Sequence, residues 1–136
     1  MSALFRWSDR YSVDVASIDG QHKQLIMMVN ELNEARQAGH EAEVIGSILA
    51  RLIDYTDKHF KHEEQLMRTH GYPGFAKHRQ EHADLVRKVL DLQTKVEAGK
   101  AALTVEVILF LSSWLANHIR RSDKELGAFL SARQVA

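Results

Sequence analysis

Histidines and acidic residues recur in this sequence at spacings that suit a metal site. The segment Lys58–Met67, KHFKHEEQLM, begins the zinc-protease pattern H-E-x-x-H at His62, but Leu66 stands where the second histidine of that pattern would be. Residues four apart on an α-helix project side by side, so His59 and Glu63 form a candidate ligand pair instead. The segment therefore does not predict a protease, but it supplies two donors on one helix face.

The same spacing recurs at His78 and His82, and further candidates lie near the ends of two other apolar runs. Taken singly, such signals have ordinary explanations, because a lone inward histidine is usually a hydrogen-bonded core residue and a His/Glu pair is usually a surface contact. Together they favour a metal site, since buried imidazoles and carboxylates must be paired or metal-bound to offset their desolvation. The candidate ligands are His22, His59, Glu63, His78, His82, His118 and Asp123.

Four runs of apolar residues at helical spacing carry these candidates. Gly39 and Gly99 stand where two helices should end, Pro73 lies in the turn GYPG, and Thr104 is placed to cap the fourth helix. The helices are expected at residues 18–38, 41–69, 75–98 and 105–121, with a short terminal segment at 123–131.

Short connections between long helices imply antiparallel neighbours. We therefore predict one domain over residues 1–136, an all-α, up-down-up-down antiparallel four-helix bundle. Residues 1–17 should form an irregular N-terminal arm, with Phe5 and Trp7 packed on the bundle. In this fold the starts of the first and third helices share one end with the ends of the second and fourth, and all the candidate ligands map there.

Two neighbours of the candidate ligands are expected to stay outside the site. His62 lies about 100° around the second helix from Glu63 and should flank the site, and Glu64, about 100° beyond Glu63, should be solvated. The fourth helix raises a conflict, because His118 and Asp123 are five residues apart, about 140° of azimuth on a regular α-helix. A π-type bulge or a break within residues 119–122 would bring both onto one face.

Composition excludes several classes of function. The 18 basic and 18 acidic residues cancel, so no overall field favours nucleic acid or an anionic membrane. Zero cysteines exclude disulfides, thiolate metal sites and a thiol nucleophile. No window has the apolar length of a signal peptide or a membrane span. We expect a cytoplasmic monomer of 136 residues.

The sequence resembles the haemerythrin family, and its single-domain bacterial members in particular. The resemblance covers nearly the whole chain, in order and with matching spacings. It rests on I-D-x-Q-H-K at 18–23, H-F-x-x-E-E-x-x-M at 59–67, G-Y-P at 71–73 followed by His78 and His82, and W-L-x-x-H-I-x-x-x-D-K at 114–124.

The resemblance implies a non-haem di-iron centre, bridged by an oxo or hydroxo group, that binds dioxygen reversibly. In the family pattern one iron takes His78, His82 and His118, the other takes His22 and His59, and the bridging carboxylates are Glu63 and Asp123. The second iron then has one position open for oxygen. Side chains that fall near the ligands should form a dry oxygen pocket, or simply ordinary core: Leu25, Phe60, Trp114, Leu115 and Ile119.

The function implied by this resemblance is that of an oxygen carrier or store rather than an enzyme, with an oxygen-consuming enzyme as one recipient. Two alternatives stay open. One is an oxygen or redox sensor acting on a separate partner, as the same domain does when it is fused to signalling proteins. The other is a di-iron enzyme, either a peroxidase or a protein that handles nitric oxide.

Overall fold

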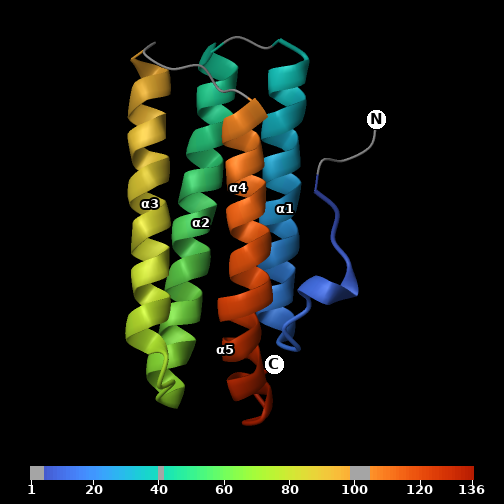
Figure 1. The fold of residues 1–136 in the computed structure, drawn as a ribbon, viewed down its shortest axis with the longest axis vertical. Coiled ribbons are helices and arrows are strands. Elements are labelled where there is room, and N and C mark those ends of the chain that lie inside the picture. Colours follow the sequence, from blue (N-terminus) through green and yellow to red (C-terminus); the bar gives the residue numbers. More distant parts are fainter. Residues whose placement is uncertain (1–4, 40–41, 99–104) are drawn as a thin grey trace.

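Four long helices stand side by side and alternate in direction (Figure 1). The computed structural model describes residues 5–39, 42–98 and 105–136, and within those ranges the regular structure is entirely helical. The long helices are α1 (Ala16–Gln37), α2 (Ala42–His70), α3 (Phe75–Glu97) and α4 (Val105–His118). The shorter elements are the 3-10 helix η1 (Asp9–Tyr11), the π-helix η2 (Ile119–Asp123) and α5 (Lys124–Ser131). The predicted all-α bundle is confirmed.

The helix boundaries follow from the local sequence. α2 ends at a turn in which Gly71 adopts a φ of 65°, a conformation that glycine accepts without strain, and the N–H of Tyr72 donates to the carbonyl oxygen of Met67 at 2.9 Å. The expected helices agree with the observed ones to within two or three residues. The expected start at residue 41, the cap Thr104 and the stop at Gly99 lie outside the described residues.

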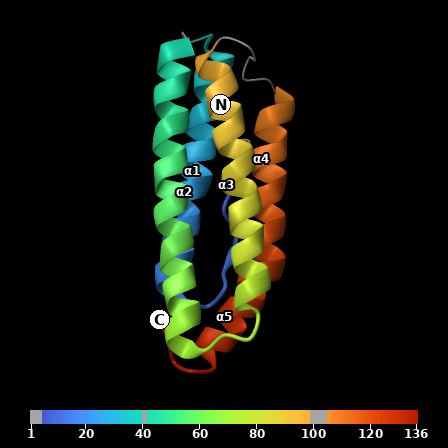
Figure 2. The same ribbon diagram turned by 90° about the vertical axis from the view of Figure 1, so that its left-hand side faces the viewer.

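Apolar stripes on the helices meet in the interior, where Leu25, Val29 and Leu32 of α1 are almost inaccessible to solvent. α1 packs against α2 and α4, and α2 also packs against α3. Figure 2, turned by 90°, shows α5 lying near the end of the bundle where α2 turns into α3. Val44 is 41% exposed, because it lies in the first turn of α2, at the end of the apolar stripe.

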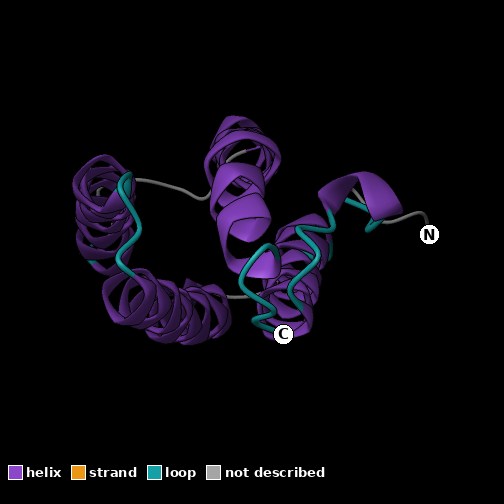
Figure 3. Cartoon of the chain, turned by 90° about the horizontal axis from the view of Figure 1, so that it is seen from below, coloured by secondary structure: helices purple, strands orange, loops and turns teal. Residues whose placement is uncertain are grey.

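The N-terminal arm is fastened to α1 by side chains of that helix. Asp19 accepts hydrogen bonds from the Ser12 hydroxyl at 2.6 Å and the Val13 N–H at 2.9 Å. Asn30 exchanges two hydrogen bonds with the backbone of Phe5. Viewed from below, the arm lies on the outer side of the bundle (Figure 3). Phe5 is buried and Trp7 packs, partly buried, against the core, as predicted.

The arm also touches α5 closely. A Cβ atom built on Gly127 would lie 2.1 Å from the carbonyl oxygen of Val13 and 2.6 Å from the Val13 Cβ. Glycine at this position therefore allows two backbones to meet. The contact ties the arm to the segment that follows Asp123.

Candidate metal centre

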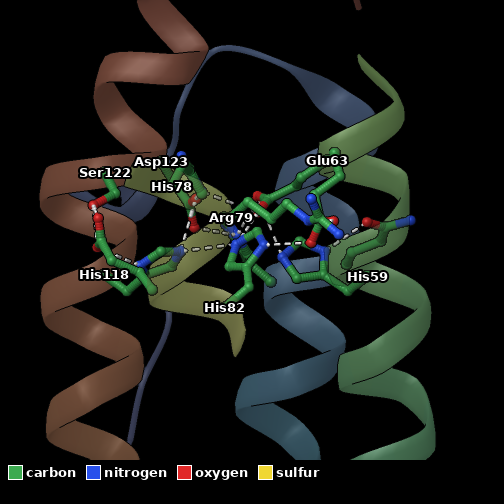
Figure 4. A network of polar contacts seen from close by, with 12 residues as sticks. His59, Glu63, His78, Arg79, His82, His118, Ser122 and Asp123 are labelled. Atoms are coloured by element: carbon green, nitrogen blue, oxygen red, sulfur yellow. Dashed lines mark hydrogen bonds and ion pairs between the residues drawn. The ribbon is translucent and has the colours of Figure 1, made fainter. Parts of the chain in front are cut away.

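The side chains predicted as ligands converge in one buried cluster between the helices, and Figure 4 shows those from α2, α3, α4 and η2 pointing toward one another. None of the seven is more than 5% exposed. They come from α1, α2, α3, α4 and the π-helix η2, so the cluster exists only when the whole bundle is assembled. The donor atoms fall into two groups, in each of which all atoms lie within 4.8 Å of one another. One group is Glu63, His78, His82, His118 and Asp123, and the other is His22, His59, Glu63 and Asp123.

Glu63 belongs to both groups because its two oxygens face different histidines. Its Oε1 lies 3.1 Å from Nε2 of His82 and 3.5 Å from Nε2 of His78. Its Oε2 lies 3.3 Å from Nε2 of His59 and 3.5 Å from Nε2 of His22. One carboxylate thus spans the space between a three-imidazole position, lined by His78, His82 and His118, and a two-imidazole position, lined by His22 and His59.

Asp123 spans the same two positions from a different helical segment. Its Oδ1 lies 2.9 Å from Nε2 of His78 and 3.3 Å from Nε2 of His118. Its Oδ2 lies 3.0 Å from Nε2 of His22. The two carboxylates therefore have equivalent geometry, with one oxygen toward each position.

Asp123 reaches the cluster because the helix changes its winding. The π-helix Ile119–Asp123 follows directly after His118 and widens the turn between the two donors. A π-turn takes one residue more than an α-turn, so it restores the alignment that the spacing of His118 and Asp123 would lose on a regular helix. The predicted distortion is confirmed, and it is a bulge rather than a break, since α5 continues from Lys124.

An outer ring of polar side chains orients three of the imidazoles through their Nδ1 atoms. Nδ1 of His59 lies 2.6 Å from Oε1 of Gln21. Nδ1 of His82 lies 3.0 Å from Oε2 of Glu64. An N–H at Nδ1 leaves the Nε2 lone pair directed into the cluster, which is the tautomer that a metal ligand needs.

The third contact of this kind ties the π-helix to α3. Nδ1 of His118 lies 3.2 Å from Oε1 of Glu81, and the Ser122 hydroxyl donates to the same carboxylate at 2.6 Å. The prediction that Glu64 is solvated is wrong, because its side chain is only 16% exposed and contacts His82. Sequence reasoning gave no role to Gln21 or Glu81. The signal available for both was their position immediately before a candidate ligand histidine.

His62 lies outside the cluster. Its Nε2 contacts the Ser17 hydroxyl at 3.2 Å, and its side chain is half-buried at the helix edge. Burial, followed by the neighbouring His59, lowers the pKa of His62. This placement agrees with the prediction that His62 flanks the site.

The imidazoles and carboxylates of the cluster shift one another's pKa values. Burial lowers the pKa of His22, but Asp123 and Glu63 outweigh that effect and raise it to about 9. The same balance raises the pKa of His78 to about 10. Burial raises the pKa of both carboxyl groups, yet the surrounding imidazoles hold each pKa well below its usual range. The carboxylates are thus anionic and demand positive charge beside them.

The donor set fits metal cations. Among the described residues, most of the buried side-chain polar atoms that lack a hydrogen-bond partner are in this cluster. They include both oxygens of Glu63, both oxygens of Asp123, and Nε2 of His22 and of His78. Buried groups of this kind are expected to be satisfied, and two cations between the carboxylates would satisfy them together. Imidazole and carboxylate donors without sulfur suit iron and similar transition metals.

An apolar cavity of about 50 Å³ adjoins the cluster. Four of the five predicted pocket residues line it: Leu25, Phe60, Trp114 and Leu115. Ile119 is fully buried but is not part of the lining. Two aromatic rings join the cavity to the cluster, since Phe60 stacks on His82 at 3.7 Å between ring centroids and Trp114 stacks on His118 at 4.5 Å.

In the part of the chain that the structure describes, no helix combines the length and apolar character needed to cross a bilayer.

Comparison with known proteins agrees with the geometry of the cluster. The profile of the family described as "Hemerythrin HHE cation binding domain" matches residues 13–130. A bacteriohemerythrin from Methylococcus capsulatus is 42% identical over 131 residues, which cover 96% of this chain and 99% of the relative.

A bacteriohemerythrin from Pseudomonas aeruginosa is 37% identical over 86% of this chain and 75% of its own length. Among solved structures, a wild-type hemerythrin superposes with a TM-score of 0.91 and 41% identity, covering 95% of this chain and 99% of the other. A hemerythrin mutant in which one leucine is replaced by alanine superposes with a TM-score of 0.92 at 40% identity, covering 96% and 99% of the two chains. The chain belongs to the haemerythrin family.

Proposed function

We propose that this protein binds dioxygen reversibly at a pair of iron ions and serves as an oxygen carrier or store. One observation carries the proposal: Glu63 and Asp123 each direct one oxygen toward the three-imidazole position and the other toward the two-imidazole position. Such paired, spanning carboxylates are what a two-metal centre requires. The proposed ligands are His78, His82 and His118 at the first position, His22 and His59 at the second, and Glu63 and Asp123 at both.

The two positions differ in the number of donors that the chain supplies. The first offers three imidazoles and two carboxylate oxygens, and the second offers two imidazoles and two carboxylate oxygens. The second position is therefore the one with room for an external ligand. Iron at these positions would supply the reversible electron transfer on which oxygen uptake and release depend.

The surrounding side chains favour a neutral diatomic ligand over water. Leu25, Phe60, Trp114 and Leu115 line the apolar cavity beside the cluster, and the hydroxyl of Thr56, which also lines it, donates to the carbonyl oxygen of Leu52 at 2.7 Å. Oxygen is apolar and enters such a cavity without losing hydrogen bonds, whereas a water molecule there would need polar partners. The dry lining should also slow proton delivery to the centre and so slow its oxidation.

The chemistry of the donors favours binding over activation of oxygen. Di-iron carboxylate proteins of the ferritin-like class build their sites from glutamates and Glu-x-x-His pairs. No histidine in this sequence has a glutamate three positions before it. A centre with five imidazoles and two carboxylates is less electron-donating than a carboxylate-rich one, and it gives weaker support to the high-valent iron that O–O cleavage needs.

Iron analysis combined with an air–vacuum cycle tests this proposal. The purified ferrous protein should contain two irons per chain, change colour in air and return to its starting spectrum under vacuum. Glu63→Ala, which removes one spanning carboxylate, should contain fewer than two irons per chain and should show no reversible colour change. Irreversible conversion of the wild-type protein in air would contradict the carrier role and favour a redox sensor or an enzyme.

A further inference from the structure

The outer ring of the metal centre is divided by charge. At the three-imidazole position the Nδ1 atoms of His82 and His118 contact carboxylates, Glu64 at 3.0 Å and Glu81 at 3.2 Å. At the two-imidazole position Nδ1 of His59 contacts the neutral amide of Gln21 at 2.6 Å.

His22, the remaining imidazole of the two-imidazole position, has no outer partner in the part of the chain that the structure describes. Nδ1 of His22 is buried and makes no hydrogen bond within the described residues. Anionic groups therefore support one position only. Glu81 is also held in place by the Ser122 hydroxyl, which donates to it at 2.6 Å, and Glu64 lies 3.7 Å from the exposed Arg79 side chain.

We infer that the two metal positions are unequal, that the three-imidazole position takes up the first ion, and that Glu64 and Glu81 contribute to the difference. The inference rests on the proposed two-metal site and adds an order of filling to it. The physical reason is that a carboxylate accepting the Nδ1–H makes the imidazole a stronger donor at Nε2, more so than a neutral amide does. Glu64 and Glu81 are positioning residues here, since neither reaches into the cluster.

The number of histidines alone would also favour the first position, so the test must separate that effect from the effect of the outer ring. Glu64→Gln and Glu81→Gln keep the shape of each side chain and remove its charge. Gln21→Glu does the reverse at the two-imidazole position. Asp84→Asn is a matched control, because it removes a charge from α3 at an exposed carboxylate that contacts Gln80 and Arg87 rather than an imidazole.

The experiment is a titration of the metal-free protein with Co²⁺, a divalent ion that accepts the same donors as Fe²⁺. Native mass spectrometry counts chains with no, one and two ions, and calorimetry gives the two affinities. At one equivalent, wild-type chains with a single ion should dominate. His118→Ala should lower the affinity for the first ion, whereas His59→Ala should leave that affinity close to the wild-type value and weaken the second.

The substitutions in the outer ring should then move the two affinities in opposite directions. Glu64→Gln and Glu81→Gln should each weaken the first by about tenfold or more, the usual effect of losing such a partner. Gln21→Glu should strengthen the second, a gain that damage to the fold would not produce. Asp84→Asn should change neither.

Three results would overturn the inference: equal affinities in the wild-type protein, a first ion that depends on His59 rather than His118, or Glu-to-Gln effects no larger than that of Asp84→Asn. Each leaves the proposed function standing if two ions are bound. A wild-type chain that never takes a second ion would instead overturn the proposed two-iron function, and the inferred order of filling would fall with it.

Discussion

Replacement of Gly127 by alanine should destabilise the protein although alanine is the better helix former. The new Cβ would sit 2.1 Å from the Val13 carbonyl oxygen, where real contacts are not found below 3.0 Å, so the arm and α5 would have to move apart by nearly an ångström. Val13 is 2% exposed, and its N–H is fixed by Asp19, so the arm has little freedom to yield.

The expected size of the effect combines two opposing contributions. Overpacking of a close contact costs about 1–3 kcal/mol, and the upper end applies because backbone faces backbone. The gain in helix propensity over glycine offsets about 1 kcal/mol of that. We therefore expect the free energy of unfolding to fall by about 2 kcal/mol, a large part of the ~5–15 kcal/mol typical of a domain.

Urea denaturation followed by circular dichroism, at equal metal loading, measures this change. Gly46→Ala is the matched control, because a Cβ there would meet nothing within 4 Å and alanine should stabilise α2 by up to ~1 kcal/mol. If Gly127→Ala were as stable as the wild-type protein, or gained stability as Gly46→Ala should, the close contact between the arm and α5 would not exist in solution.

Three further predictions concern the site. Glu63→Ala should lower iron content well below two per chain, as measured by metal analysis; a full complement of iron would mean that Glu63 does not span the two positions. His62→Ala should keep two irons and a normal oxygenated spectrum, because His62 contacts Ser17 and not the cluster; loss of iron would make it a ligand. Leu115→Ser should let water into the apolar cavity and speed oxidation in air while iron content stays intact, and an unchanged rate would show that Leu115 does not seal it.

The sequence was enough to predict which candidate ligands share a helix face, because this depends only on the angle between residues around one helix axis. His59 and Glu63 share a face at four-residue spacing, and the mismatch between His118 and Asp123 was enough to predict a distorted turn. These are properties of single helices. No knowledge of how the helices pack is needed to obtain them.

Contacts between side chains of neighbouring helices could not be predicted from the sequence in the same way. Glu64 lies about 100° around α2 from Glu63, which predicts solvent for an isolated helix, but α3 packs at that side and brings His82 within 3.0 Å. Glu81 likewise precedes a candidate ligand on its own helix yet contacts His118 on another. Such contacts depend on the distance and angle between two helices. The angular position of a residue on its own helix determines neither of these quantities. Ile119, for which both a pocket position and an ordinary core position were expected, is fully buried but does not line the apolar cavity.

The π-helix has a consequence for what holds Asp123 in place. The wide turn sets the rotation of everything after it, so Leu126 and Leu130 of α5, both fully buried, owe their inward direction to the same extra residue. Relaxing the turn to an ordinary α-turn would rotate α5 by about 100° and carry these two leucines toward water. Burial of each leucine is worth about 1.5–3 kcal/mol, so the core opposes that relaxation independently of any metal. The buried leucines of α5 thus keep the Asp123 carboxylate directed into the cluster before any ion binds.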